Sequence, residues 1–274
     1  MSRNDRLLVA SKKGRESDIN QLLDLGANVN HQDKKGNTAL LIASQKGHEG
    51  VVKLLTEKGA NINHRNETHV TALLTASANG HEGIVKHLIE KGANKHCLDK
   101  VGRDALLSAV TQGHTSIAKY LIDNGANINN KSCLGQTALM FASRDGHAAI
   151  VEYLTRWVIV DAKGGKYFDP LGRLCEINYQ DWSGWHALLV AAGEGHDSIV
   201  KILIEKGAYI NHQNDTGVCA LIAAAAEGHE AVVKRLIKEG ADMSLKDENG
   251  WTAVTFAANK GHKSIVKLLI ASQK

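Results

Sequence analysis

Histidine is the residue type of this chain whose number and spacing most suggest chemistry. The sequence holds 14 histidines, and a Gly-His pair recurs at steps of 33 residues, with one step of 49. The histidines of this series are His48, His81, His114, His147, His196, His229 and His262. Imidazole nitrogens are common zinc ligands, so the series raises the question of a shared metal ion.

Geometry argues against that ion. If the repeated units stack at the helix-packing distance of about 8–10 Å, successive imidazoles lie too far apart to share an ion whose ligand bonds are about 2 Å. We therefore expect no metal site, and we expect each of these imidazoles to hydrogen-bond to backbone in a loop between units. His31, His64 and His212 recur elsewhere in the unit, and there too surface hydrogen bonding is the expected role.

Other catalytic signatures are missing from the sequence. It has no His-Glu-x-x-His and no Cys-x-x-Cys, and its "DAKGG" lacks the Gly-Lys-Ser/Thr ending of a phosphate loop. No serine or cysteine stands in a recognisable nucleophile setting. We therefore expect a protein that is not an enzyme and that carries no cofactor.

Composition narrows the class further. The 274 residues are 43% hydrophobic and 23% charged, which is typical of a folded chain. The net charge of +4 is spread along the sequence without a dense basic cluster, so nucleic acid is not an expected partner. Cys97, Cys133, Cys175 and Cys219 are widely spaced, which favours reduced thiols. Without an apolar leader or a stretch approaching about 18 apolar residues, we expect no membrane contact and a cytoplasmic or nuclear location.

The repeated unit determines the fold. In "KKGNTALLIASQKGHEGVVKLLTEKGANINHRN", Thr38 suits an N-cap, "ALLIASQK" predicts a short helix, and Gly47 ends it. "HEGVVKLLTEK" predicts a second helix, and Gly59 suits the left-handed position that stops it. The remaining residues form an extended loop that turns back into the next unit. One unit is too small to bury its apolar face, so stability must come from contacts between neighbouring units.

The pattern G-x-T-A-L-x-x-A-x-x-x-G-H-x-x-(I/V)-V-x-x-L-I-x-x-G-A-x-(I/V)-N closely resembles the ankyrin repeat, over about residues 5–271 apart from one insertion. The resemblance implies an all-α fold: an ankyrin-repeat α-solenoid of helix–turn–helix units with β-hairpin fingers and a concave binding face. It also implies a scaffold without catalytic activity of its own. We expect one continuous domain, with a capping repeat at 1–33, repeats 1–3 at 34–132, repeat 4 with its insertion at 133–181, and repeats 5–7 at 182–274. Because no polar capping helix follows the last repeat, we also expect the chain to be part of a longer protein.

The chain departs from the family's Thr-Pro-Leu-His motif in ways that affect stability. Alanine replaces the proline in every unit, and the histidine position is mostly apolar. The threonine that caps the first helix becomes Asp104, His186 and Cys219 in three units. Aspartate still caps well, but cysteine caps poorly, so we expect the sixth unit to fray more readily.

The insertion, at about 156–176, reads "RWVIVDAKGGKYFDPLGRLCE" and holds the only proline of the chain. Its β-branched run and "AKGGK" favour a β-hairpin, and the alternative is that "WVIV" prolongs the preceding helix by about a turn. Its aromatic residues Trp157, Tyr167 and Phe168 have two interpretations. They plug a break in the stack, or they form a side wall of the binding face.

Finger positions that are polar in the first unit (Lys34, Lys35 and Asn37) become apolar in later units. The apolar finger residues are Val70, Val101, Leu134, Trp182, Trp185, Val218 and Trp251. A line of apolar side chains along one face indicates a recognition surface, and tryptophan is a frequent hot-spot residue at interfaces. The alternative is that these rings fill space against adjacent fingers.

These observations predict a monomeric, non-enzymatic scaffold that binds an extended or helical segment of a partner protein on its concave face over repeats 4–7. The expected anchors are Trp182, Trp185 and Trp251. A second hypothesis is a receptor for a nucleotide-like small molecule, with a base stacked on Trp185 or Trp251. Its phosphate would then meet Lys35, Arg103 or Arg144.

A third hypothesis concerns modification rather than binding. The asparagines at the family's G-A-x-V-N position are hydroxylation candidates. They are Asn30, Asn63, Asn129 and Asn211.

Overall fold

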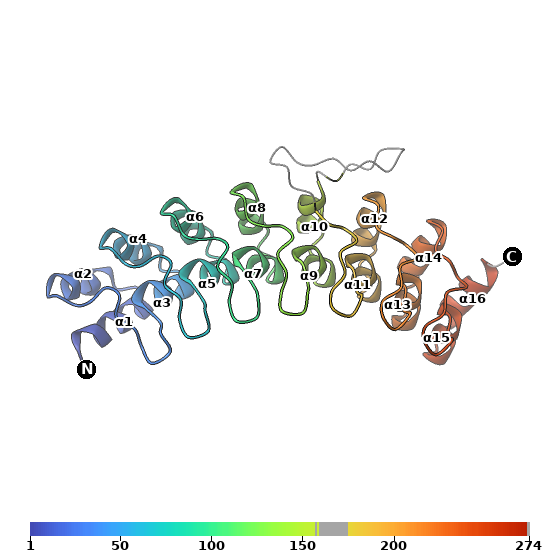
Figure 1. The fold of residues 1–274 in the computed structure, drawn as a ribbon, viewed down its shortest axis with the longest axis horizontal. Helices are drawn as coiled ribbons and strands as arrows, with labels where there is room; N and C mark the ends of the chain where they lie inside the picture. Colours follow the sequence, from blue (N-terminus) through green and yellow to red (C-terminus); the bar gives the residue numbers. More distant parts are fainter. Residues whose placement is uncertain (157, 159–174, 273–274) are drawn as a thin grey trace. The chain divides into compact units, whose positions relative to one another are not determined.

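The computed structural model describes residues 1–156, 158 and 175–272, and it divides the chain into two compact units, Met1–Asn130 and Lys131–Lys274. Both units are built from helix pairs joined by loops (Figure 1). Within the described ranges all regular secondary structure is helical, which confirms an all-α repeat solenoid. That the two units form one continuous domain stays a prediction.

In each pair we call the first helix inner and the second outer; the loop that leads into an inner helix is its finger. The first unit comprises α1 (Arg3–Lys13), α2 (Glu16–Asp24), α3 (Ala39–Lys46), α4 (Glu49–Glu57), α5 (Ala72–Ala78), α6 (Glu82–Glu90), α7 (Ala105–Thr111) and α8 (Thr115–Asp123). The second comprises α9 (Ala138–Arg144), α10 (Ala148–Thr155), α11 (Ala187–Gly193), α12 (Asp197–Glu205), α13 (Ala220–Glu227), α14 (Glu230–Lys238), α15 (Ala253–Asn259) and α16 (Lys263–Ala271). Helices α1 and α2 belong to the segment predicted to be a capping repeat, and we number the helix pairs after it as repeats 1–7.

The core lies between neighbouring repeats. In repeat 1 the inner-helix residues Leu40 and Ala43 and the outer-helix residues Val52 and Leu55 are at most 1% exposed. Inner helices pack on inner helices and outer on outer within each unit, so the apolar face of one repeat is covered by the next. Alanine at the inner-helix positions lets these helices approach closely.

Within each unit, a glycine and a histidine join each repeat to the one before it. The histidine Nε2–H donates to a backbone carbonyl of the preceding repeat in His48 to Lys12, His81 to Gln45, His114 to Ala78, His196 to Arg144, His229 to Gly193 and His262 to Ala226, over 2.8–3.2 Å. The ring also occupies the space beside a glycine of the preceding repeat. A Cβ added at Gly47, for example, would lie 2.6 Å from His81 Cε1. Gly47 has φ +77°, so this position needs glycine for its backbone as well. The expectation that these imidazoles bond to backbone is confirmed for these six.

The fingers are held by their own first residue. In the second finger, for example, Asn66 Oδ1 accepts the backbone N–H groups of Thr68 and Val70. Neighbouring fingers are joined by backbone hydrogen bonds, such as Glu67 N–H to the Lys35 carbonyl at 3.1 Å. The predicted β-hairpins are short: the described residues hold no strand, only isolated antiparallel bridges at Gln32–Thr38, Lys131–Thr137 and Gln213–Cys219.

An asparagine at the foot of several fingers makes a further link between repeats. Asn30 Oδ1 accepts the backbone N–H of Asn61 at 2.7 Å, and Asn211 Oδ1 accepts that of Asp242 at 2.8 Å. Asn63 bonds to the next repeat in the same way. These asparagines therefore have a structural role, and their hydroxylation stays a prediction.

The insertion begins and ends in packed backbone. Helix α10 ends at Thr155, Val158 is buried, and Lys206 Nζ donates to the Val158 carbonyl at 3.0 Å. Cys175 is 5% exposed and occupies the position of the buried Ala208 in the next repeat. Burial raises the pKa of the Cys175 thiol to about 12, so this thiol is a neutral packing group. The predicted hairpin itself lies outside the described residues, as does the alternative helix extension.

Most inner helices begin at a side-chain cap. Thr38, Thr71, Thr137 and Thr252 each accept the backbone N–H three residues on, and Asp104 does the same at 2.8 Å, as expected. His186 also caps, through Nδ1 at 3.2 Å, which sequence analysis missed. Cys219 is buried and makes no side-chain cap hydrogen bond, which confirms that this helix lacks the family's cap.

We predict that Cys219→Thr raises the free energy of unfolding of the full chain by about 0.5–1 kcal/mol, because it restores an N-cap to α13. Urea unfolding measures the change. Cys219→Val is the control, since it has the shape of threonine without the hydroxyl. Equal effects of the two substitutions would show that packing rather than capping is responsible.

Candidate functional site

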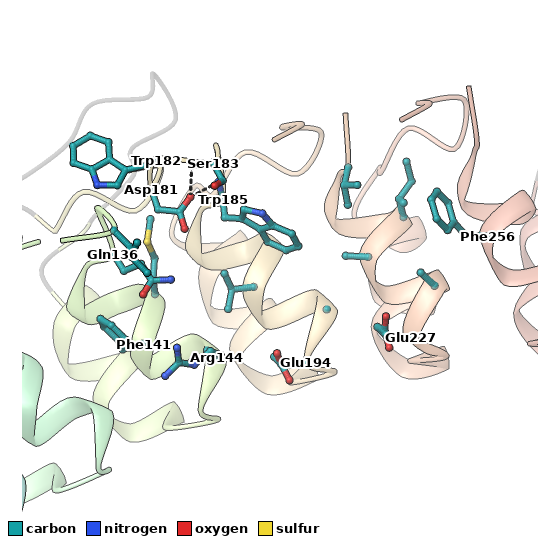
Figure 2. Close-up of a pocket in the computed structure, with 18 residues that line it drawn as sticks. Gln136, Phe141, Arg144, Asp181, Trp182, Ser183, Trp185, Glu194, Glu227 and Phe256 are labelled. Carbon is teal, nitrogen blue, oxygen red and sulfur yellow. Dashed lines mark hydrogen bonds between the residues drawn. The ribbon is translucent and has the colours of Figure 1, made fainter. Parts of the chain in front are cut away.

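The second unit contains a pocket of about 630 Å³, lined by the inner helices of repeats 4–7 and by the fingers of repeats 4–6 (Figure 2). One residue from each inner helix forms the floor at equivalent positions: Phe141, Val190, Ala223 and Phe256. One turn further along, Gly193 and Ala226 also line the pocket. Small side chains thus occupy the middle of the floor and a phenylalanine stands at each end, which leaves an apolar hollow between two aromatic walls.

The finger side of the pocket is built by Trp185 and Val218. Asp181 Oδ1 accepts the backbone N–H groups of Ser183 and Trp185, each at 3.0 Å, and Asp181 N–H donates to the Trp185 carbonyl at 2.9 Å. Figure 2 shows this turn holding Trp185 above α11. The backbone of Trp185 is therefore fixed, while its half-buried indole lines the pocket.

Leu134 and Trp182 line the same pocket at its outer edge. Trp182 is 67% exposed, yet its Nε1–H donates to the Cys133 carbonyl at 2.8 Å. A Cβ added at Gly135 would lie 3.1 Å from the Trp182 ring, so the indole lies against the preceding finger. Trp182 thus packs on its neighbour and still presents much of its surface to solvent.

The other predicted site residues lie elsewhere. Trp251 does not line this pocket; its ring packs edge-on against Phe256, with centroids 5.2 Å apart. Val70 lines a pocket in the first unit, and Val101 is exposed and lines neither of these two pockets. Trp157, Tyr167 and Phe168 lie outside the described residues.

Charges surround the apolar floor unevenly. The charged lining residues are Arg144, Asp181, Glu194 and Glu227. Arg144 donates to both carboxylate oxygens of Asp145, at 2.9 and 3.1 Å, and this pair raises the pKa of the Arg144 guanidinium. Glu194 and Glu227 are exposed at the ends of α11 and α13 (Figure 2). The only cation of the lining is thus bonded to a neighbouring carboxylate.

The first unit has a pocket of about 450 Å³ with different chemistry. Thr75 and Ser108 stand there at the floor positions that hold Phe141 and Val190 in the second unit. Lys35 and Arg103 line this pocket, and Arg103 pairs with Asp99 at 2.9 Å. It is therefore a polar pocket.

Sequence analysis missed the floor residues and the two glutamates. Gln45 and Lys46 of repeat 1 occupy positions whose residue type varies from repeat to repeat, and the equivalent residues of repeat 5 are Gly193 and Glu194. The same alignment places Phe141 and the rest of the floor at the position of Ile42. Aligning the repeats at these positions would therefore have identified the floor residues and the glutamates from the sequence.

No group of three or more histidine, cysteine, aspartate or glutamate side chains is placed to hold a metal ion among the described residues. None of the described helices has the length and apolar character needed to cross a bilayer.

Comparison with known proteins supports the repeat assignment. The sequence profile described as "Ankyrin repeats (3 copies)" matches residues 7–99, 73–163, 162–247 and 221–274. The resemblance proposed from the sequence is thereby confirmed along nearly the whole chain. No curated protein matches it.

His186 supports the pocket from below, because it follows Trp185 and caps α11. Its side chain is fully buried, and since Nδ1 accepts the Leu189 N–H, Nε2 carries the proton and donates to the Tyr209 carbonyl at 3.2 Å. Burial and the neighbouring His212 ring, 4.6 Å away, lower the pKa of His186 to about 4. Protonation would remove the Nδ1 cap.

This lowered pKa predicts a loss of stability in acid. Between pH 6.5 and about 4 the unfolded chain binds a proton at His186 that the folded chain does not, so the free energy of unfolding falls as pH falls through this range. We expect this group to cost about 2 kcal/mol at pH 4.5 relative to pH 7.5. His186→Thr, which keeps a cap but cannot titrate, should lose less stability over the same range in urea unfolding. Parallel pH profiles for the two proteins would contradict the prediction.

Proposed function

Because the chain belongs to the ankyrin-repeat family, we propose that it is a non-enzymatic scaffold that holds a segment of a partner protein in the pocket of its second unit. Ankyrin repeats are generally protein–protein interaction scaffolds, which supports the class of function. The position of the site on repeats 4–7 is supported by the pocket itself.

The observation that carries the proposal is the combination of a fixed tryptophan and an apolar hollow. The backbone of Trp185 is held by Asp181, so only the side-chain torsions of the indole remain to be ordered when a partner covers it. The hollow between Phe141 and Phe256 offers apolar surface that a partner side chain can bury. Hot spots at protein interfaces typically combine an aromatic anchor with such a desolvated pocket.

The charge of the pocket favours a protein segment over a nucleotide-like ligand. Trp185 could stack on a base, but Arg144 is bonded to Asp145, and three carboxylates line the same pocket. A phosphate placed there would meet net negative charge. In the first unit, Lys35 and Arg103 line a pocket whose lining contains no aromatic ring.

We also propose that one copy of the chain is sufficient for binding. All the lining residues come from the second unit of one chain, and the floor runs from Phe141 to Phe256. The monomeric state stays a prediction.

The prediction that tests the site compares two tryptophans at equivalent finger positions. Trp185→Ala should reduce capture of partner proteins from a lysate of the source organism by roughly tenfold or more, because it removes the anchor of the pocket. Trp251→Ala should retain capture, since Trp251 does not line the pocket. Quantitative mass spectrometry of the captured proteins measures both effects, and thermal unfolding verifies that each variant is folded. Retained capture by folded Trp185→Ala would rule out this site.

A further inference from the structure

The pocket of the second unit distinguishes between partners by charge as well as by apolar surface. Three carboxylates line it, those of Asp181, Glu194 and Glu227, against the single guanidinium of Arg144. Asp145 binds that guanidinium through both oxygens. A segment that enters the pocket therefore meets an excess of negative charge.

The two glutamates are placed to contact a partner. Glu194 and Glu227 stand at the same position of successive repeats, one at the end of α11 and the other at the end of α13. Both are exposed, and neither forms an ion pair with a described residue, although the charge of Glu194 contributes to the raised pKa of the Arg144 guanidinium. Figure 2 shows both at the edge of the pocket away from Trp185. The floor thus lies between an aromatic finger and an acidic edge.

The first unit shows that this acidic edge is not a requirement of the repeat. The equivalent positions there are Lys46, Asn79 and Gln112, none of them acidic. The floor differs too, since Thr75 and Ser108 replace Phe141 and Val190. The apolar floor and the acidic edge therefore occur together in the second unit, on a helix framework that does not demand either.

We propose that the segment bound in this pocket carries a large apolar side chain with lysine or arginine within a few residues of it. This inference rests on the proposed function and specifies its partner. The apolar side chain fills the hollow above Gly193 and Ala226, beside Trp185. The basic side chains lie along Glu194 and Glu227, where a cation neutralises the excess negative charge and an acidic segment would be repelled.

Gly193 allows the hollow to be filled without disturbing the fold. A Cβ added at Gly193 would meet only the Ala223 Cβ, at an ordinary 3.7 Å, and Gly193 is the last residue of α11. Gly193→Leu should therefore fold at least as well as the wild-type protein, because leucine favours helix over glycine. Its side chain occupies the hollow. Ala78→Leu is the matched control, because Ala78 is equivalent to Gly193 and lines the pocket of the first unit.

The test is a selection of random twelve-residue peptides displayed on phage against the full chain. We expect the enriched peptides to contain a large apolar residue and an excess of lysine and arginine over aspartate and glutamate. A labelled enriched peptide should bind at least tenfold more weakly to Gly193→Leu and equally well to Ala78→Leu. Glu194→Lys/Glu227→Lys should weaken binding by roughly tenfold at low salt, and less at high salt. Asn79→Lys/Gln112→Lys, at equivalent positions in the first unit, should not.

The outcomes separate the inference from the proposed function. Peptides that require the open hollow but show no basic excess, or that bind equally to the charge-reversed variant, would overturn the inference and leave the proposed function standing. Recovery of no peptide that Gly193→Leu weakens would overturn both. Acidic peptides enriched on the wild-type protein would also contradict the inference.

Discussion

The junction between a glycine and the histidine of the next repeat is the interaction on which the rest of this structure depends. The imidazole lies where a side chain at the glycine would lie, and its Nε2–H bonds to a carbonyl at the end of the preceding inner helix. Glycine leaves that space free and adopts the left-handed backbone without strain, and the imidazole fills the space and supplies the donor. The 33-residue period is thus the distance along the sequence at which this glycine–histidine contact between repeats recurs.

Because these junctions repeat, the inner helices of a unit place equivalent residues along its pocket. The three equivalent positions are that of the floor residues, that of Gly193 and that of Glu194. The shape and charge of each pocket are then determined by single side chains on a backbone that is the same in every repeat. Gly193 and Ala226 make a hollow, Glu194 and Glu227 make its edge acidic, and Trp185 closes it from the finger. In the first unit the same positions give a polar pocket. The chemistry of each pocket therefore depends on which side chains occupy these repeated positions.

The fold could be predicted from the sequence because its determinants are local and repeated. Thr38 marks the residue at which a helix begins, and Gly47 marks the residue at which it ends. The 33-residue period indicates that each repeat packs on its neighbours. The site was harder, because pocket formation depends on pairs of residues. Trp185 and Trp251 occupy the same finger position, but Trp251 packs on Phe256, whereas repeat 5 has the smaller Val190 there. Likewise, nothing in the sequence indicated that His186 caps α11 through Nδ1.

The most direct test of the central claim compares two histidines of the first unit. His81→Ala removes the bond to the Gln45 carbonyl and empties the space beside Gly47, so we expect the free energy of unfolding to fall by about 2–3 kcal/mol in urea denaturation. His96→Ala removes an exposed histidine outside the Gly-His series and should change it by less than about 0.5 kcal/mol. Similar small losses for the two variants would contradict the view that the glycine–histidine junction holds the repeats together.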